Sequence, residues 1–267
     1  MARRTLRSSR AARKERTKRT KTLLLLFVVV LGLAGVAIYA LSRPLFRIQR
    51  VELIGATRIP EQSIRMLLAQ HLSGAYFGVI PRAHILFYPR AAIRNALFLR
   101  FPSLSHASLS LKNFAALQVS VREREPEALW CIAEHVCFQM DRTGFVFEEA
   151  GAAREDQYYR LEGTATTSPI GRTVIESEEL ADLLAFLKGL ERLSLEPRWV
   201  KFEDAHEEMS VMLSGGLRLL LMKGAYAKAL ESMRVLLKNE AIPKVGSELS
   251  VSYIDLRYGN RVYFKSR

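Results

Sequence analysis

Residues 107–121 read Ala-Ser-Leu-Ser-Leu-Lys-Asn-Phe-Ala-Ala-Leu-Gln-Val-Ser-Val, and this stretch decides the fold class. Apolar and polar side chains alternate on both sides of Lys112-Asn113. Because successive side chains of a strand point to opposite faces, this alternation predicts two half-buried strands that pair antiparallel. The inward-facing residues are expected to be Ala107, Leu109, Leu111, Leu117, Val119 and Val121.

Upstream of this pair, one strand and two helices are expected. Phe46–Ile54 alternates imperfectly and ends at a Gly-Ala turn, which is typical of a strand. Pro60 fits the first turn of a helix, and a second helix is expected to begin at Pro89 and to end before Pro102. The order strand, helix, helix, strand, strand predicts a small sheet that carries both helices on one face.

Downstream of Pro126, short strand-like runs alternate with two segments of helical periodicity, 176–193 and 225–238. The chain ends with the runs 251–258 and 261–265, joined by Gly259-Asn260. A Gly-Asn dipeptide between two strand-like runs predicts a two-residue β-hairpin. The fold class expected is therefore α+β, with a C-terminal mixed α/β domain whose sheet is rich in antiparallel pairs.

The net charge of +13 is concentrated at the N-terminus. Residues 1–21 hold ten Lys and Arg residues against one acid, which leaves 30 basic and 26 acidic residues in the rest of the chain. The tail has no interleaved aromatic residues of the kind that stack on bases, so nucleic-acid binding is not expected. Two interpretations stay open: the tail sets membrane topology, or it also contacts anionic lipid or a cytoplasmic partner.

The next segment, residues 22–42, contains no charged residue. As a helix it would extend about 31 Å, which matches a hydrocarbon core of about 30 Å. This length favours a transmembrane helix over a cleaved signal peptide, whose apolar stretch is usually about 7–15 residues. The basic flank predicts a cytoplasmic N-terminus, with residues 43–267 outside.

Two cysteines, Cys131 and Cys137, lie in the C-terminal part of the chain. The five residues between them could turn a hairpin that brings the two sulfur atoms face to face. A cross-strand disulfide is one hypothesis, and two small buried apolar residues are the other. Only His135 lies nearby, so the spacing does not indicate a metal site.

Three motifs, in the same order, resemble those of the FtsQ/DivIB family of bacterial cell-division proteins, which contain a POTRA module. They are Arg50–Gly55 before Pro60, the junction from Val119–Trp130 to Met140–Phe147, and Tyr253–Tyr258 before a short final strand. The resemblance implies four parts: a basic tail 1–21, a transmembrane helix 22–42, a POTRA-like β-α-α-β-β domain 46–124, and a C-terminal β domain 125–267. The stretch Ile80–Arg100 departs from the family by its length and its arginine and aromatic content.

Members of this family are scaffolds rather than enzymes. The resemblance therefore implies a protein of the bacterial cytoplasmic (inner) membrane at the division septum. It would bind small single-span partners resembling FtsB and FtsL through the β domain, and other divisome members through the POTRA-like domain. No cofactor, metal or catalytic residue is expected.

The final run, residues 261–265, is short and lies at the chain end, which predicts a sheet edge able to accept a partner strand. Apolar anchors are expected at Tyr258, Val262, Tyr263 and Phe264. Arg257 and Arg261 are expected to pair with acidic residues of the partner. The alternative is that Tyr258, Val262 and Phe264 belong to the core.

Two other function classes compete with a scaffold. A membrane-anchored envelope enzyme would need a nucleophile or metal site, but the five His are scattered and the sequence lacks HExxH, GxSxG and SxxK motifs. A POTRA-bearing translocation component would usually carry repeated POTRA units or a long barrel, and neither pattern is present.

Overall fold

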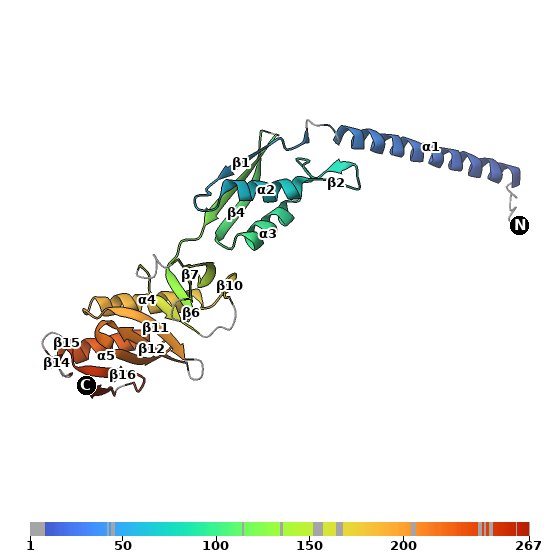
Figure 1. Ribbon diagram of the computed structural model, residues 1–267. Coiled ribbons are helices and arrows are strands. Elements are labelled where there is room, and N and C mark those ends of the chain that lie inside the picture. Colours follow the sequence, from blue (N-terminus) through green and yellow to red (C-terminus); the bar gives the residue numbers. More distant parts are fainter. Residues whose placement is uncertain are drawn as a thin grey trace, which may run out of the picture. The chain divides into compact units, whose positions relative to one another are not determined.

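The computed structural model shows an α+β protein with a large mixed sheet. The structure describes residues 9–41, 43, 46–113, 115–133, 136–151, 157–163, 168–203, 207–239, 242, 244–245, 248–259 and 261–266. The chain divides into two compact units (Figure 1). Unit 1 comprises Met1–Leu97 and His106–Val121, and unit 2 comprises Phe98–Ser105 and Arg122–Arg267.

The first element of unit 1 is the helix α1, Ser9–Leu41. Residues 1–8 of the basic tail and Ser42 lie outside the described residues. In the part of the chain that the structure describes, no helix combines the length and the apolar character needed to cross a bilayer. The helix α1 begins inside the charged tail, so residues 22–41 are the second part of a longer helix and do not form a separate one.

This finding corrects two predictions. The transmembrane helix over residues 22–42 is not supported, so that part of the predicted fold class is wrong. The predicted localisation, a single-pass protein of the bacterial cytoplasmic membrane with its C-terminal part outside, depended on that helix and is wrong with it.

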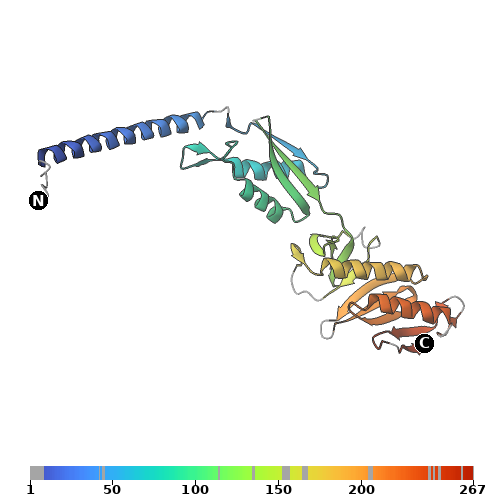
Figure 2. The same cartoon turned by 180° about the vertical axis from the view of Figure 1, so that it is seen from behind.

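The remainder of unit 1 is built around a three-stranded sheet of order β1-β5-β4, in which β1 runs parallel to β5. The helices α2 and α3 lie along the sheet (Figures 1 and 2). A short hairpin, β2 and β3, is inserted between the two helices. The bounds are β1 Arg50–Ile54, α2 Glu61–Leu72, β2 Ala75–Tyr76, β3 Ile80–Pro81, α3 Arg90–Arg100, β4 Leu104–Lys112 and β5 Ala116–Glu123.

The core of unit 1 joins the two helical stripes to the inward face of the alternating strands. On the helices Ile64, Leu68, Ile93 and Leu97 are fully buried, and on the strands Leu109, Leu117 and Val119 are buried with them. Burying each such side chain stabilises the fold by about 1.5–3 kcal/mol. The inward-facing positions predicted from the alternation in residues 107–121 are therefore buried, except Leu111, which is exposed.

Unit 2 contains a ten-stranded sheet of order β10-β8-β7-β6-β9-β11-β12-β13-β16-β17. Most neighbours are antiparallel, while β9 runs parallel to β6 and β11, and β16 runs parallel to β13. The strands of the first half are β6 Ala128–Ala133, β7 Val136–Met140, β8 Phe145–Glu149, β9 Arg160–Glu162 and β10 Arg172–Thr173. Those of the second half are β11 Pro197–Glu203, β12 Glu208–Leu213, β13 Arg218–Met222, β16 Val251–Asp255 and β17 Tyr263–Ser266.

Two helices, α4 (Ser177–Glu191) and α5 (Tyr226–Lys238), pack against this sheet and against each other (Figure 2). The short elements η3 Ser214–Gly216, β14 Lys244–Val245 and β15 Glu248–Leu249 complete the unit. Leu183, Leu187 and Met233 of the helices are fully buried in one cluster with Val211 and Leu219 of the strands. This cluster is the main core of the unit.

A tight turn joins β7 to β8. One carboxylate oxygen of Asp141 accepts hydrogen bonds from the Thr143 amide and hydroxyl groups, at 2.8 and 2.6 Å, and the other accepts from Arg124. Burial by itself would raise the pKa of Asp141, but the hydrogen bonds from Thr143 and Arg124 outweigh it and hold the pKa below its usual value. Gly144 completes the turn at φ 73°, a conformation that suits glycine.

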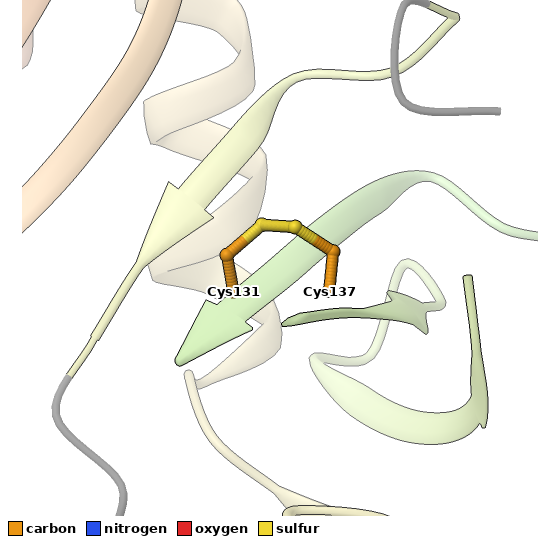
Figure 3. The surroundings of a disulfide bond; sticks show 2 residues. All are labelled: Cys131 and Cys137. Carbon is orange, nitrogen blue, oxygen red and sulfur yellow. A yellow bond between two sulfur atoms is a disulfide. The ribbon is translucent and has the colours of Figure 1, made fainter. Parts of the chain in front are cut away.

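The strands β6 and β7 form a hairpin in which Cys131 lies directly opposite Cys137. The structure joins the two by a disulfide bond (Figure 3). Both cysteines are buried in a small cluster with Leu129, against which Ala150 and Tyr158 pack. His135, the one potential metal ligand near the cysteines in the sequence, lies outside the described residues.

We expect Gly144→Ala to destabilise unit 2 because the added methyl group would stand 1.9 Å from the carbonyl oxygen of Ile175. Gly171→Ala is the matched control, since its φ is also positive but nothing lies within 4 Å of the added carbon. In the control variant, backbone strain alone should lower the free energy of unfolding by about 1–2 kcal/mol. Gly144→Ala should lower the free energy of unfolding by at least about 1 kcal/mol more than the control, as measured by urea unfolding. Equal decreases in the two variants would show that the turn accommodates the added methyl group without further destabilisation.

We expect reduction of the Cys131–Cys137 bond to lower the free energy of unfolding by about 2 kcal/mol, because the closed loop is short. Urea unfolding curves with and without reductant measure this difference. A Cys131→Ala/Cys137→Ala double variant is the control and should give the same curve under both conditions. A wild-type curve that does not respond to reductant would contradict the contribution of the bond.

Candidate functional site

The last strand, β17, lies at one end of the ten-stranded sheet. It pairs antiparallel with β16, and the sheet continues no further beyond it within the described residues. All four of its residues are exposed. A terminal strand of this kind offers backbone N–H and C=O groups to a strand from another chain.

The register of β17 decides how its side chains are presented. Tyr263 lies opposite Asp255, and Phe264 lies opposite Ile254. Because consecutive side chains of a strand point to opposite faces, Tyr263 and Phe264 contact different faces of the sheet. Both are partly exposed, so each face of the edge carries one aromatic side chain.

Tyr258 joins Tyr263 on one side of the edge. Their rings meet edge to face at 90°, with centroids 5.4 Å apart, a geometry that aromatic pairs favour. Tyr258 is 59% exposed and Tyr263 is 49% exposed. The pair is therefore ordered by its own contact and still offers apolar surface to a partner.

An ion-pair network holds the chain just before Tyr258. The Arg257 guanidinium donates to both carboxylate oxygens of Asp255, at 2.9 and 2.6 Å, and to Glu208 on β12, at 2.6 Å. The Arg257 amide also donates to Asp255, at 3.1 Å. Hydrogen bonding from Arg257 outweighs burial and holds the pKa of Asp255 below its usual value.

The predicted partner-binding residues therefore fall into two groups. Tyr258, Arg261, Tyr263 and Phe264 lie at the surface. Val262 is half-buried and packs against the main core, and Arg257 directs its guanidinium to carboxylates of its own chain. These two side chains position the exposed ones.

The connection between β16 and β17 differs from the two-residue hairpin expected at Gly259-Asn260. β16 ends at Asp255 and β17 begins at Tyr263, so the loop runs over residues 256–262. Asn260 lies outside the described residues. The longer loop places Tyr258 outside the strand, where its ring can turn onto Tyr263.

Lys228 of α5 is not among the partner-binding residues predicted from the sequence. In the structure its ammonium group reaches the loop, 3.3 Å from where a side-chain carbon on Gly259 would stand. Lys228, Arg261 and Lys265 are all exposed. Together they place three positive charges near the edge. Lys228 could not have been predicted from the local sequence, because α5 and β17 are far apart in the chain.

This arrangement favours strand binding over metal chemistry. Within the described residues, no three His, Cys, Asp or Glu side chains come together as a metal site would require. What the edge provides is backbone hydrogen-bonding groups, three aromatic side chains and nearby cations.

Comparisons with known proteins identify neither a family nor a function for the chain. No model of a known protein family matches the chain. No curated protein matches it significantly. Functional inference therefore depends on the geometry of the edge and on the sequence motifs.

We expect Arg257→Gln to lower the free energy of unfolding by roughly 2 kcal/mol at neutral pH, because it leaves the buried carboxylate of Asp255 without its charged donor. The pKa of Asp255 is lowered in the folded protein, so the stabilisation is full above the usual pKa of about 4 and is lost as the pH falls below it. Urea unfolding of both proteins between neutral and acidic pH measures the difference.

Arg261→Gln is the control, because Arg261 is exposed and lies in the same loop. It should change stability by less than about 0.5 kcal/mol at every pH. If the gap between the wild type and Arg257→Gln were independent of pH, Asp255 would not be the group that Arg257 stabilises.

Proposed function

We propose that this chain is a non-enzymatic scaffold of the bacterial cell-division complex that binds small division proteins, similar to FtsB and FtsL, through the edge strand β17. The observation that carries the proposal is the exposed end of the ten-stranded sheet, where the Tyr258–Tyr263 pair lies beside the free side of β17.

Strand addition explains how such an edge would recognise a partner. The backbone groups of β17 would supply affinity, and the side chains on alternate positions would supply selectivity. Tyrosine is enriched among the residues that dominate binding energy at interfaces. The partner strand is therefore expected to place apolar side chains against Tyr258 and Tyr263.

Charge narrows the choice of partner. Arg261 and Lys265 flank the aromatic residues, and Lys228 reaches the same loop. A partner segment with acidic residues beside its apolar ones would be attracted to this edge and oriented on it. Arg257 is not expected to contribute a direct contact, since its guanidinium is bound to Asp255 and Glu208.

The sequence motifs support the same role. The run Tyr253–Tyr258, one of the three motifs that resemble the FtsQ/DivIB family, covers the end of β16 and the start of the loop that presents Tyr258. The other two motifs lie at β1 and at the β5-to-β8 region. Unit 1 is proposed to bind other members of the division complex.

The test is site-specific photocrosslinking in the native cells, with a photoreactive amino acid at position 263 and identification of captured proteins by mass spectrometry. The same probe at Val235 on α5 is the control, because its exposure of 46% nearly equals the 49% of Tyr263. We expect position 263, and not position 235, to capture a small division protein with a coiled-coil segment.

A Tyr258→Ala/Tyr263→Ala double variant should weaken binding of the captured partner at least tenfold, with an unchanged urea unfolding curve. Capture of the same proteins from both probe positions, or of none from position 263, would overturn the edge-strand mechanism. Normal division in cells that lack the protein would count against the division role.

A further inference from the structure

The segment that connects α2 to α3 exposes an unusual amount of apolar surface. It consists of the β2–β3 hairpin and the turns that follow it, residues 74–88, here called the aromatic hairpin. Phe77 at its tip is 97% exposed and Leu86 is 68% exposed. Val79 and Phe87 are also exposed. Figure 1 shows the hairpin projecting beyond the end of α2, and Figure 2 shows the same from behind.

The backbone holds Phe77 outward despite a local cost. The turn closes with a hydrogen bond from the Val79 amide to the Tyr76 carbonyl oxygen, at 3.0 Å, and φ is 51° at Phe77 and 73° at Gly78. A bulky residue rarely adopts a positive φ. Because Phe77 keeps this unfavourable backbone conformation although its side chain is almost fully exposed, we infer that the side chain has a function outside the core.

His84 lies beneath the turn that carries the exposed residues Leu86 and Phe87. His84 is fully buried, and its ring centroid lies 6.0 Å from that of Phe46 and 5.1 Å from that of Phe87. Its Nδ1 accepts a hydrogen bond from the Leu86 amide at 3.1 Å. This bond fixes the turn that points the Leu86 side chain into solvent.

The chain segment that contains the aromatic hairpin carries only positively charged side chains. The 28 residues from Ser73 to Arg100 contain four arginines and neither aspartate nor glutamate. The four, Arg82, Arg90, Arg94 and Arg100, are all exposed. Arg82 lies over the Tyr76 ring, 5.7 Å from its centroid. The surface thus favours an anionic partner.

We propose that the aromatic hairpin inserts its apolar tip into an anionic lipid surface. Binding at a membrane interface has two components. Aromatic and aliphatic side chains enter the boundary of the acyl chains, and arginines contact the anionic headgroups. The tip is convex, and a fluid lipid surface receives a single projecting phenylalanine, whereas a protein would need a matching pocket. The contact is with the bilayer surface and involves no helix that crosses it.

The test uses an environment-sensitive fluorophore, nitrobenzoxadiazole, on the full chain. Cys131 and Cys137 are joined in a disulfide, so a cysteine introduced by Phe77→Cys is labelled selectively. Met66→Cys on α2 is the matched control, because Met66 is 60% exposed and lies in the same unit. Both probes are carried on the same full chain, so lipid contacts elsewhere in the protein affect the two alike.

The labelled proteins are mixed with vesicles of phosphatidylglycerol and phosphatidylcholine, and separately with vesicles of phosphatidylcholine alone. We expect a blue shift and an intensity gain at position 77 with the anionic vesicles, a weaker response with the neutral ones, and no response at position 66. In a protein labelled through Val79→Cys, adding Phe77→Ser should raise the half-saturating lipid concentration roughly tenfold. Adding Arg82→Gln and Arg90→Gln instead should raise it at least tenfold.

Three results would overturn the proposal. The probe at position 77 could stay unchanged with both vesicle types. It could respond no more than the probe at position 66, which would show that the hairpin is not the contact. It could also respond to an acidic amphipathic peptide and not to vesicles, which would identify the surface as a protein-binding one.

Discussion

An open β-sheet must end at two strands whose outer backbone groups have no partner within the sheet, and this constraint shapes unit 2. At one end the sheet closes with β10, only two residues long, which leaves few backbone groups to pair. At the other end β17 presents four exposed residues and two aromatic side chains. The two ends therefore differ in kind. The β10 end has the shorter strand, and the β17 end carries the aromatic side chains on which the proposed strand addition depends.

The rest of unit 2 keeps that second edge in place. The strands β13 and β16 are parallel neighbours, and α5 lies between them in the chain, as parallel strands need a crossover connection. α5 packs closely on α4 because Gly189 leaves room for Leu230, where a methyl group would stand 2.5 Å from that side chain. The same helix carries Lys228 to the loop before β17. Core packing and the charge of the edge thus depend on one element.

Sequence patterns predicted the parts that depend on neighbouring residues. Alternation in residues 107–121 indicated β4 and β5, and helical spacing indicated α2 to α5. The patterns could not show that β1 pairs parallel with β5, or that Arg257 reaches Glu208 across 49 positions, because both are long-range contacts. Apolar composition also predicted a transmembrane helix over residues 22–42, whereas no helix among the described residues has the length and apolar character of a membrane span.

The candidate site also contains a long-range contact that the sequence patterns could not reveal. The aromatic residues Tyr258, Tyr263 and Phe264 could be named from the sequence, and Arg257 was predicted to pair with acidic residues of the partner. Its guanidinium instead joins β16 to β12 through Asp255 and Glu208. Fixing this arginine removes freedom from the loop in which Tyr258 lies, and a loop ordered before binding loses less entropy when a partner arrives. In the proposed function, this internal ion pair would therefore favour recognition without touching the partner.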